Sequence, residues 1–310
     1  MENKLHVSAS PHIHSGRSVQ KIMLDVIIAL LPATIAGTII FGIRSLAIVY
    51  VCVVVSVLSE ALFNKIVKKP QSIGDLSAVV TGLILALNLP VNAPLWQAAV
   101  GSVFAIVIVK CVFGGIGKNV VNPAATARVF MLVAFSSLTK AAFPKDVVDT
   151  ASSATPLAQL AEGQQPELMD LFLGNIGGAL GETCTLALLI GGLYLLVKKV
   201  ITWHIPVAFV GTVFLFSLAL EGGNVETALA WILSGGLFLG AIFMATDYVT
   251  SPATPFGRIV FGIGAGFLTV VIRKWGVYPE GVSFAILIMN ILNPFIDSLT
   301  ARKLFGGGKK

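Results

Sequence analysis

Residues 22–42 read IMLDVIIALLPATIAGTIIFG, and residues 44–63 continue as RSLAIVYVCVVVSVLSEALF. Each stretch has the length of an α-helix that crosses the hydrocarbon core of a bilayer, which takes about 20 mostly apolar residues. Together they hold only three charged side chains, Asp25, Arg44 and Glu60. We therefore expect two membrane-spanning helices joined by a very short turn.

The composition of the whole chain agrees with a membrane protein. Of its 310 residues 12% are charged and 56% are hydrophobic, whereas soluble domains have about 25% charged residues. This excludes a soluble enzyme, a disordered chain and a nucleic-acid-binding domain. Cys52, Cys111 and Cys184 each lie inside an apolar run, and no two have the spacing of metal ligands, so we expect neither a disulfide scaffold nor a metal site.

The apolar runs predict an all-α integral membrane protein with about ten transmembrane helices. The predicted spans are 22–42, 44–63, 76–90, 95–114, 122–138, 176–197, 203–220, 226–246, 257–273 and 281–298. The spans at 76–90 and 122–138 are short and rich in small and polar residues, so we expect broken helices there. Because non-helical backbone at membrane depth is tolerated only against protein or a polar cavity, these two segments are predicted to line the functional interior.

The positions of Lys and Arg predict the orientation. With the N-terminus in the cytoplasm, the cytoplasmic loops hold fourteen of the 21 Lys and Arg residues and the outer loops hold five, as the positive-inside rule requires. Both termini are then cytoplasmic, and residues 1–20 lack the apolar core of a signal peptide. The predicted order is a cytoplasmic segment at 1–20, a first membrane repeat at 21–138, an extracytoplasmic loop at 139–175, a second repeat at 176–300 and a basic cytoplasmic tail at 301–310.

Two stretches about 160 residues apart follow the same pattern. Residues 81–117 and 240–281 each contain an apolar span, a loop with proline, a Gly-rich apolar span, basic residues and then glycine. With five spans per half, the second copy is inverted, and inverted repeats commonly hold a site at the bilayer midplane between them. Chance similarity between Gly- and Ala-rich helices is the alternative.

Ionisable side chains inside membrane spans are costly and usually mark a pathway or a paired site. Glu182, Asp247 and Asp25 are our candidates for an ion pathway, although the two aspartates also fit an interfacial position. Glu60 precedes a basic cluster of Lys65, Lys68 and Lys69, which is one candidate partner for it. Two cations, Lys110 and Arg128, fall within spans and are available to neutralise buried carboxylates.

Five motifs in a fixed order carry a resemblance to a known family. They are SPHIHSGRSVQKIMLDVIIALLPA (10–33), GDLSAVVTGLILALNLP (74–90), FGGIGKNVVNPAATARVF (113–130), DTASSATP (149–156) and MATDYVTSPATPFGR (244–258). The chain resembles the RnfD component of the Rnf electron-transport complex and, more distantly, the NqrB component of the sodium-translocating NADH:quinone reductase. The resemblance implies a flavoprotein of the bacterial cytoplasmic (inner) membrane that relays electrons within a translocase, where ferredoxin and NAD chemistry is coupled to Na⁺ or H⁺ transport.

In that family flavin mononucleotide (FMN) is bound covalently, as a phosphoester on the last threonine of a motif D-x-x-[ST]-[GAS]-A-T. Asp149, Ser152, Ser153, Ala154 and Thr155 fit the motif, so the resemblance makes Thr155 the acceptor. Read alone, the same residues are an ordinary Ser/Thr turn before a proline.

A second Ala-Thr-Pro, ending in Thr254 and Pro255, departs from the motif. Pro252 takes the small-residue slot, and Asp247 lies seven residues before the threonine instead of six.

Family members also hold a second, non-covalent flavin, riboflavin. The resemblance suggests a site for it near Asn119 and Asn122. The preceding run Gly114-Gly115-Ile116-Gly117-Lys118 follows a membrane span and departs from the P-loop pattern, so we do not expect it to bind a nucleotide phosphate.

The chain has neither a Rossmann fingerprint nor the cysteines of an iron–sulfur cluster, and we expect no catalytic residue of its own. The resemblance implies that the other Rnf subunits (C, G, E, A and B) supply those functions, above all RnfG with its own covalent flavin. The alternatives from the sequence are a urea-channel-like transporter or channel without redox function, and a scaffold protein without a cofactor.

Overall fold

The structure is a computed structural model that describes residues 18–135, 138, 142–144, 155–276 and 280–301. Within these ranges every regular element is a helix, and the one β-type pairing is an isolated bridge between Ala142 and Gly178. The all-α prediction is therefore confirmed for the described chain.

Two long helices open the first layer of the molecule, as the sequence predicts. The layer contains α1 (Val19–Phe41), α2 (Ile43–Ile66), the short η1 (Ile73–Asp75), α3 (Ser77–Leu87), α4 (Leu95–Val103), its π-helical continuation η2 (Phe104–Cys111) and α5 (Pro123–Ala134). Asn122 ends the loop before α5 by capping that helix, and Pro123 occupies its first turn, where a missing N–H costs nothing.

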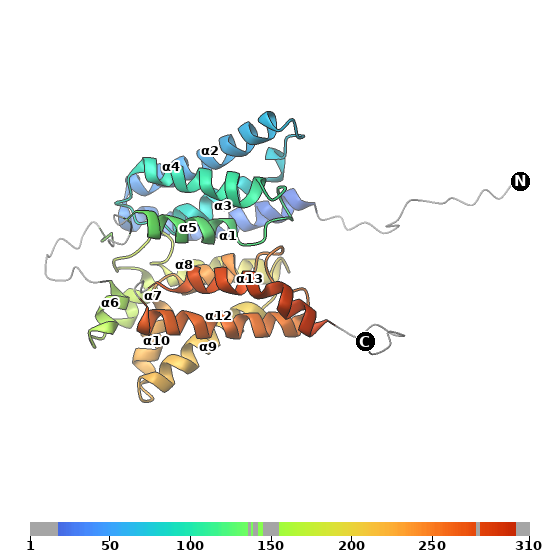
Figure 1. The fold of residues 1–310 in the computed structure, drawn as a ribbon. Helices are drawn as coiled ribbons and strands as arrows, with labels where there is room; N and C mark the ends of the chain where they lie inside the picture. Colours follow the sequence, from blue (N-terminus) through green and yellow to red (C-terminus); the bar gives the residue numbers. More distant parts are fainter. Residues whose placement is uncertain (1–17, 136–137, 139–141, 145–154, 277–279, 302–310) are drawn as a thin grey trace, which may run out of the picture.

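The second layer follows two short helices at one end of the molecule. These are α6 (Pro156–Ala161) and α7 (Leu168–Leu173), and the layer itself contains α8 (Thr185–Val197), α9 (His204–Leu220), α10 (Val225–Leu233), α11 (Leu237–Leu239), the π-helical η4 (Gly240–Met244), α12 (Pro255–Trp275) and α13 (Val282–Thr300). Figure 1 shows the two layers lying against each other, with α1 and α5 facing α8 and α13.

Four of these helices (α1, α2, α12 and α13) are long and apolar enough to cross a membrane, and α10 with α11–η4 makes a fifth span bent by 61°. The helices α3 and α5 have 11 and 12 residues, or about 17 Å at 1.5 Å per residue. A bilayer core is about 30 Å thick, so neither helix crosses it alone. The prediction of interrupted helices at 76–90 and 122–138 agrees with these short lengths.

Two predicted spans differ from the structure. The span at 176–197 becomes helical only at Thr185, because the Gly-rich residues before it form backbone hydrogen bonds elsewhere: Leu180 N and Gly181 N donate to Leu89 O and Leu87 O at 3.0 and 2.8 Å. The span at 226–246 is interrupted at residues 234–236, where Gly235 and Gly236 have φ of 66° and 67°. This left-handed backbone favours glycine.

Small residues allow the helices of the second layer to approach closely. A Cβ added to Gly262 in α12 would lie 2.7 Å from Cβ of Ala208, and one added to Gly266 would lie 2.7 Å from Cβ of Thr212. Glycines four residues apart on one face are typical of helix packing in membranes.

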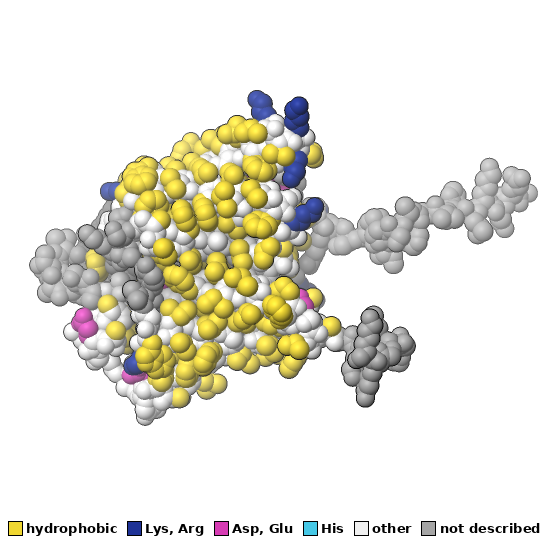
Figure 2. Space-filling view, in the orientation of Figure 1, with side chains coloured by type: hydrophobic (Ala, Val, Ile, Leu, Met, Phe, Trp, Pro, Cys, Tyr) yellow, Lys and Arg dark blue, Asp and Glu magenta, His cyan; other side chains and the backbone are white. Residues whose placement is uncertain are grey.

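Apolar side chains cover the outer faces of the helices. Ile39, Ile43, Val197 and Leu299 are between 73% and 86% exposed, and Figure 2 shows such residues across one whole side of the molecule, with most visible charged side chains at its ends. Soluble monomers rarely expose an apolar patch of this extent. The surface and the five apolar spans together indicate a membrane protein.

Candidate functional site

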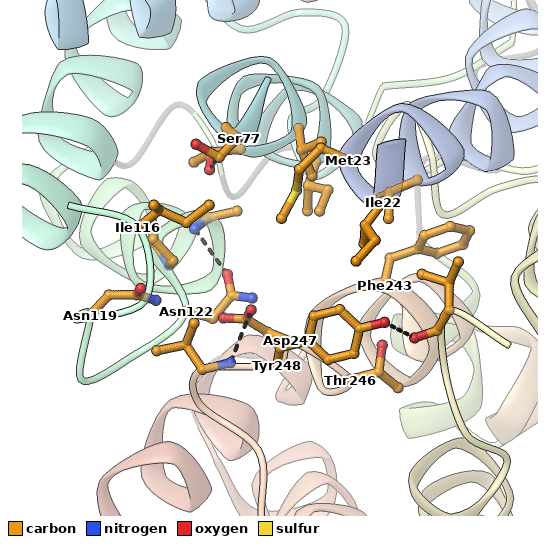
Figure 3. Close-up of a pocket in the computed structure, with 18 of the residues that line it drawn as sticks. Ile22, Met23, Ser77, Ile116, Asn119, Asn122, Phe243, Thr246, Asp247 and Tyr248 are labelled. Carbon is orange, nitrogen blue, oxygen red and sulfur yellow. Dashed lines mark hydrogen bonds between the residues drawn. The ribbon is translucent and has the colours of Figure 1, made fainter. Parts of the chain in front are cut away.

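A cavity of about 270 Å³ lies between the two layers. Its walls are mostly apolar and come from the start of α1, from α3, from the loop before α5, and from η4 with the residues that follow it. Figure 3 shows Ile22 and Met23 facing Asn119 and Asn122 across the space, with Phe243 and Tyr248 closing another side. An apolar pocket with a few convergent polar groups is the usual form of a small-molecule site.

Asn122 fixes the position of three elements around this cavity. Its Oδ1 accepts hydrogen bonds from the backbone N–H groups of Ala124 and Ala125 at 3.0 and 3.1 Å, which caps α5. Its Nδ2 donates to the carbonyl oxygen of Met244, the last residue of η4, and its backbone N donates to Oδ1 of Asn290 in α13, both at 3.1 Å. One residue therefore ties the two layers together beside the cavity.

Asn119 and Asp247 lie on the same cavity wall and are both lining residues. Nδ2 of Asn119 donates to the carbonyl oxygen of Val121 at 3.2 Å. The carboxylate of Asp247 accepts from the Val249 N–H at 3.5 Å and from the Thr250 hydroxyl at 3.2 Å. The structure therefore brings Asn119 and Asn122 to the same cavity as Asp247, which lies more than 120 residues later in the sequence.

A buried lysine lines the cavity from the first layer. Nζ of Lys110 in η2 donates to Oε1 of Glu60 at 2.8 Å and to the hydroxyl of Ser77 at 2.6 Å. The Ser77 hydroxyl in turn donates to Asp75. Of the candidate partners for Glu60, the basic cluster of Lys65, Lys68 and Lys69 is the wrong one, because the carboxylate is buried and pairs with Lys110. A lysine within an apolar span was the only signal of this contact in the sequence.

Thr155 lies away from the cavity, at the end of the molecule where α6 is found (Figure 1). It is the N-cap of α6, its Oγ1 accepts from the Ala158 N–H at 3.2 Å, and its side chain is half-buried. Leu157 and Leu160 of α6 pack into an apolar cluster with Trp231 of α10, so the helix that follows Thr155 is anchored to the membrane part. The other motif residues, Asp149, Ser152, Ser153 and Ala154, lie outside the described residues.

The second Ala-Thr-Pro has the same local structure. Thr254 caps α12 by accepting from the Gly257 N–H at 3.0 Å, and its hydroxyl donates to that of Thr300 at 2.8 Å. Threonine followed by proline thus begins a helix at both positions, so this dipeptide by itself does not distinguish a modified threonine from a cap.

Glu182 lies at the break between α10 and α11. Its Oε1 accepts from the Ala179 N–H at 2.7 Å, and its carboxylate contacts Gly236, where an added Cβ would lie 2.7 Å from Oε2. Arg273 of α12 lies next to the same break and donates to the carbonyl oxygens of Trp231, Ser234 and Gly235 at 2.6, 2.8 and 3.2 Å. A cation therefore meets the C-terminal end of one half-helix and a carboxylate the N-terminal end of the next, as helix dipoles favour.

Asp25 is not a cavity residue. Its Oδ1 accepts a hydrogen bond from the hydroxyl of Tyr194 at 2.7 Å, which links α1 to α8. The three carboxylates named from the sequence as an ion pathway thus occupy three separate places in the structure.

Comparison with known proteins identifies relatives over nearly the whole chain. The D component of the Na⁺-translocating ferredoxin:NAD⁺ oxidoreductase complex of Acetobacterium woodii is 47% identical, with 98% of this chain and 96% of that protein covered. The D component of the proton-translocating ferredoxin:NAD⁺ oxidoreductase complex of Clostridium ljungdahlii is 40% identical over 98% and 97% of the two chains. The D component of the ion-translocating oxidoreductase complex of Stutzerimonas stutzeri is 40% identical over 93% and 92%. A profile of the NQR2, RnfD, RnfE family matches residues 6–306, and the chain belongs to this family.

Proposed function

We propose that this chain is the RnfD component of an ion-translocating ferredoxin:NAD⁺ oxidoreductase of the Rnf type and serves as its membrane-embedded electron relay. The observation that carries the proposal is the near-complete alignment, at 47% identity, with the D component of such a complex. The fold supports it, because a helical body with a lipid-facing apolar surface and an internal cavity suits a protein that holds cofactors within a membrane.

We assign Thr155 as the site of a covalent FMN. The residue fits the group, because a phosphoester needs a hydroxyl that a modifying enzyme reaches, and Thr155 is half-buried at the start of a surface helix. The bound flavin would supply the one- and two-electron redox chemistry that amino-acid side chains lack. The anchoring of α6 on α10 through Leu157 and Trp231 would hold the attachment point at a fixed place relative to the membrane spans.

We assign the cavity between the layers to a second, non-covalent flavin, riboflavin. The chemistry of its walls suits an aromatic ring with a polar edge, because Ile84 and Phe243 supply apolar surface and Asn119, Asn122 and Asp247 supply polar groups. A cavity of about 270 Å³ lies just below the range of roughly 300–1,000 Å³ that small-molecule pockets have. These amide and carboxylate groups would supply hydrogen-bond donors and acceptors to the polar edge of an isoalloxazine ring.

The topology we propose has ten crossings in two inverted repeats within the cytoplasmic (inner) membrane. Two contacts support it, because α1 packs on α8 and α5 packs on α13. The first helix of one half thus contacts the first helix of the other half, and the last helix contacts the last. In addition, α1 begins and α13 ends at the same end of the helix bundle (Figure 1), opposite α6. Both termini would then be cytoplasmic, and the threonine site would face outside.

The partners we propose are the remaining Rnf subunits (C, G, E, A and B), with the covalent flavin of RnfG as the nearest redox neighbour. The coupling ion is Na⁺ or H⁺, since one relative is named for each. Glu182, Asp247 and Asp25 are the carboxylates we propose for ion transport; of these, Asp247 lines the cavity.

Intact-mass measurement of the purified chain, together with flavin extraction, tests this function. We expect the mass of one FMN phosphoester, released riboflavin, and loss of only the covalent flavin in Thr155→Val. A purified chain without visible flavin absorbance would contradict the redox function and favour the channel or scaffold alternatives.

A further inference from the structure

Lys110 lies between the cavity and a buried carboxylate. Its side chain is 3% exposed and that of Glu60 is 2% exposed. Lys110 and Ser77 both line the cavity, whereas Glu60 does not. Nζ of Lys110 lies 2.8 Å from Oε1 of its counter-ion Glu60 and 2.6 Å from the hydroxyl of the lining residue Ser77, so the ion pair lies directly beside the cavity wall.

The charges that face the cavity are few. Among the lining residues that the structure describes, Lys110 is the one Lys or Arg, and Asp247 on the opposite layer is the one carboxylate. Behind the wall, Oε1 of Glu60 also accepts from the Ser72 hydroxyl at 2.7 Å, and Asp75 accepts from Ser77. The cavity thus has the Lys110 side chain on the first layer and the Asp247 carboxylate on the second, whereas Glu60 and Asp75, the two carboxylates beside Lys110, are not lining residues.

One of the two carboxylate oxygens of Glu60 lacks a hydrogen bond within the described part of the chain. Oε2 is buried and has no hydrogen-bond partner among the described residues, while Oε1 is shared by Lys110 and Ser72. A buried ion pair gains little net stability over well-packed apolar residues, so packing alone does not account for a lysine in this wall. Lys110 also lies in the π-helical segment η2, and such segments occur frequently at functional sites.

We propose that Lys110, backed by Glu60, stabilises the negative charge that the flavin in this cavity gains on reduction. This inference rests on the riboflavin site proposed above. A reduced donor of the complex would lose one electron to the bound flavin. If no proton follows, the ring would then carry one additional negative charge. The cationic side chain of Lys110, which lies in the cavity wall, compensates that charge through space. Glu60 limits this stabilisation, because its negative charge is paired with the same ammonium group.

The proposal predicts opposite effects from the two partners of one ion pair. Lys110→Met removes the positive pole and leaves the Glu60 charge, so the midpoint potential of the flavin falls. Glu60→Gln leaves the ammonium without its counter-ion, so the potential rises. In the double variant both charges are absent, and the potential lies between those of Lys110→Met and the parent. Lys110→Arg keeps the charge and stays near the parent value.

Equilibrium redox titration of the purified full-length chain in detergent measures these potentials. Thr155→Val is the common background, so that the non-covalent flavin gives the only signal, and extracted riboflavin is quantified for each variant. We expect at least a tenfold weaker preference for the reduced flavin in Lys110→Met, which is about 59 mV for a one-electron couple. The double variant keeps the ordering measurable if the unpaired Glu60 prevents folding of the single one.

Three outcomes separate the two proposals. The role of Lys110 is supported if the midpoint potential shifts in opposite directions in Lys110→Met and Glu60→Gln. It is also supported if the potential of the double variant lies below that of the parent and the potential of Glu60→Gln lies above it. Riboflavin bound at parent level with potentials that are unchanged, or that shift in the same direction in both single variants, overturns that role and leaves the cavity assignment intact. A parent chain without riboflavin overturns the cavity assignment and this inference with it.

Discussion

Arg128 in α5 and Glu280, just before α13, form an ion pair across the interface between the two layers. Nη2 of Arg128 lies 2.6 and 2.7 Å from the two carboxylate oxygens of Glu280. The arginine side chain is 2% exposed, the glutamate side chain is 30% exposed, and Nη1 of the arginine has no partner among the described residues. Because the guanidinium is buried and depends on one carboxylate, this pair is a specific link between the layers.

Breaking this pair on one side is expected to destabilise the protein strongly. Glu280→Gln leaves a buried guanidinium without its counter-ion, which costs about 3–5 kcal/mol, and the melting temperature in detergent should fall. The double variant Arg128→Met with Glu280→Gln should recover most of the loss. Lys274→Met is the control, because its pair with Glu221 at 3.0 Å is exposed and is worth at most about 1 kcal/mol. Equal losses for single and double variants would show that the charges are not coupled.

The contact between α1 and α8 depends on the absence of a side chain at Gly191. A Cβ at this position would meet the carbonyl oxygen of Ala29 and the ring of Phe243, so Gly191→Ala should cost about 1–3 kcal/mol, as overpacking does. Gly211 is a helix glycine whose added Cβ meets nothing within 4 Å. Gly211→Ala should therefore be neutral or stabilise by up to about 1 kcal/mol. Thermal unfolding of the two variants under the same conditions measures the difference, and similar losses would contradict the packing.

Two substitutions separate the roles of Asn122. Asn122→Asp keeps an acceptor for the N–H groups of Ala124 and Ala125 but loses the donor to Met244, whereas Asn122→Ala loses both. We expect Asn122→Ala to be less stable than Asn122→Asp by about 1 kcal/mol, the usual value of a helix N-cap. Both variants should retain less riboflavin, because the bond that holds Asn122 to the end of η4 beside the cavity is lost. Riboflavin at the parent level in both would contradict a site bounded by Asn122.

Arg273 is expected to hold the break between α10 and α11 in place. Arg273→Gln removes the charge and most of the donors to three carbonyl oxygens, whereas Arg273→Lys keeps the charge without the planar fork of the guanidinium. Amide hydrogen exchange in residues 231–240 should become faster in the glutamine variant and to a smaller extent in the lysine variant. Unchanged protection of these residues in both would mean that the glycines alone determine the bend.

Helices whose stability comes from lipid contact were predictable from the sequence. Residues 22–42 and 44–63 need no partner to be recognised, because their own apolar side chains match the bilayer, and α1 and α2 occupy nearly the same ranges. The break at Ser234-Gly235-Gly236 was missed, since an apolar run that contains two glycines also suits a continuous helix. Arg273, whose guanidinium donates to the carbonyl oxygens at this break, is 38 residues away from Gly235 in the sequence.

The residues of the candidate site that belong to a sequence motif were predictable. Those that depend on an ion pair between distant residues were not. Asn119 and Asn122 were named through the resemblance, and both line the cavity. The contact between Lys110 and Glu60 joins residues 50 positions apart, and the sequence offered a nearer basic cluster as a partner for the glutamate. Local charge proximity favoured the wrong pair, since Glu60 is buried where α2 packs against α3 and η2, and Lys110 lies in η2.

The most direct test of the membrane flavoprotein assignment is peptide mapping of the native chain by mass spectrometry, with intact Thr155→Ser and Thr155→Val variants beside it. The account predicts one FMN phosphoester on the peptide that contains Thr155, retained in part by Thr155→Ser because a hydroxyl remains and absent from Thr155→Val, with the peptide around Thr254 unmodified in all three. An unmodified Thr155 peptide in chain purified from the native membrane, or a flavin that remains attached in Thr155→Val, would contradict it.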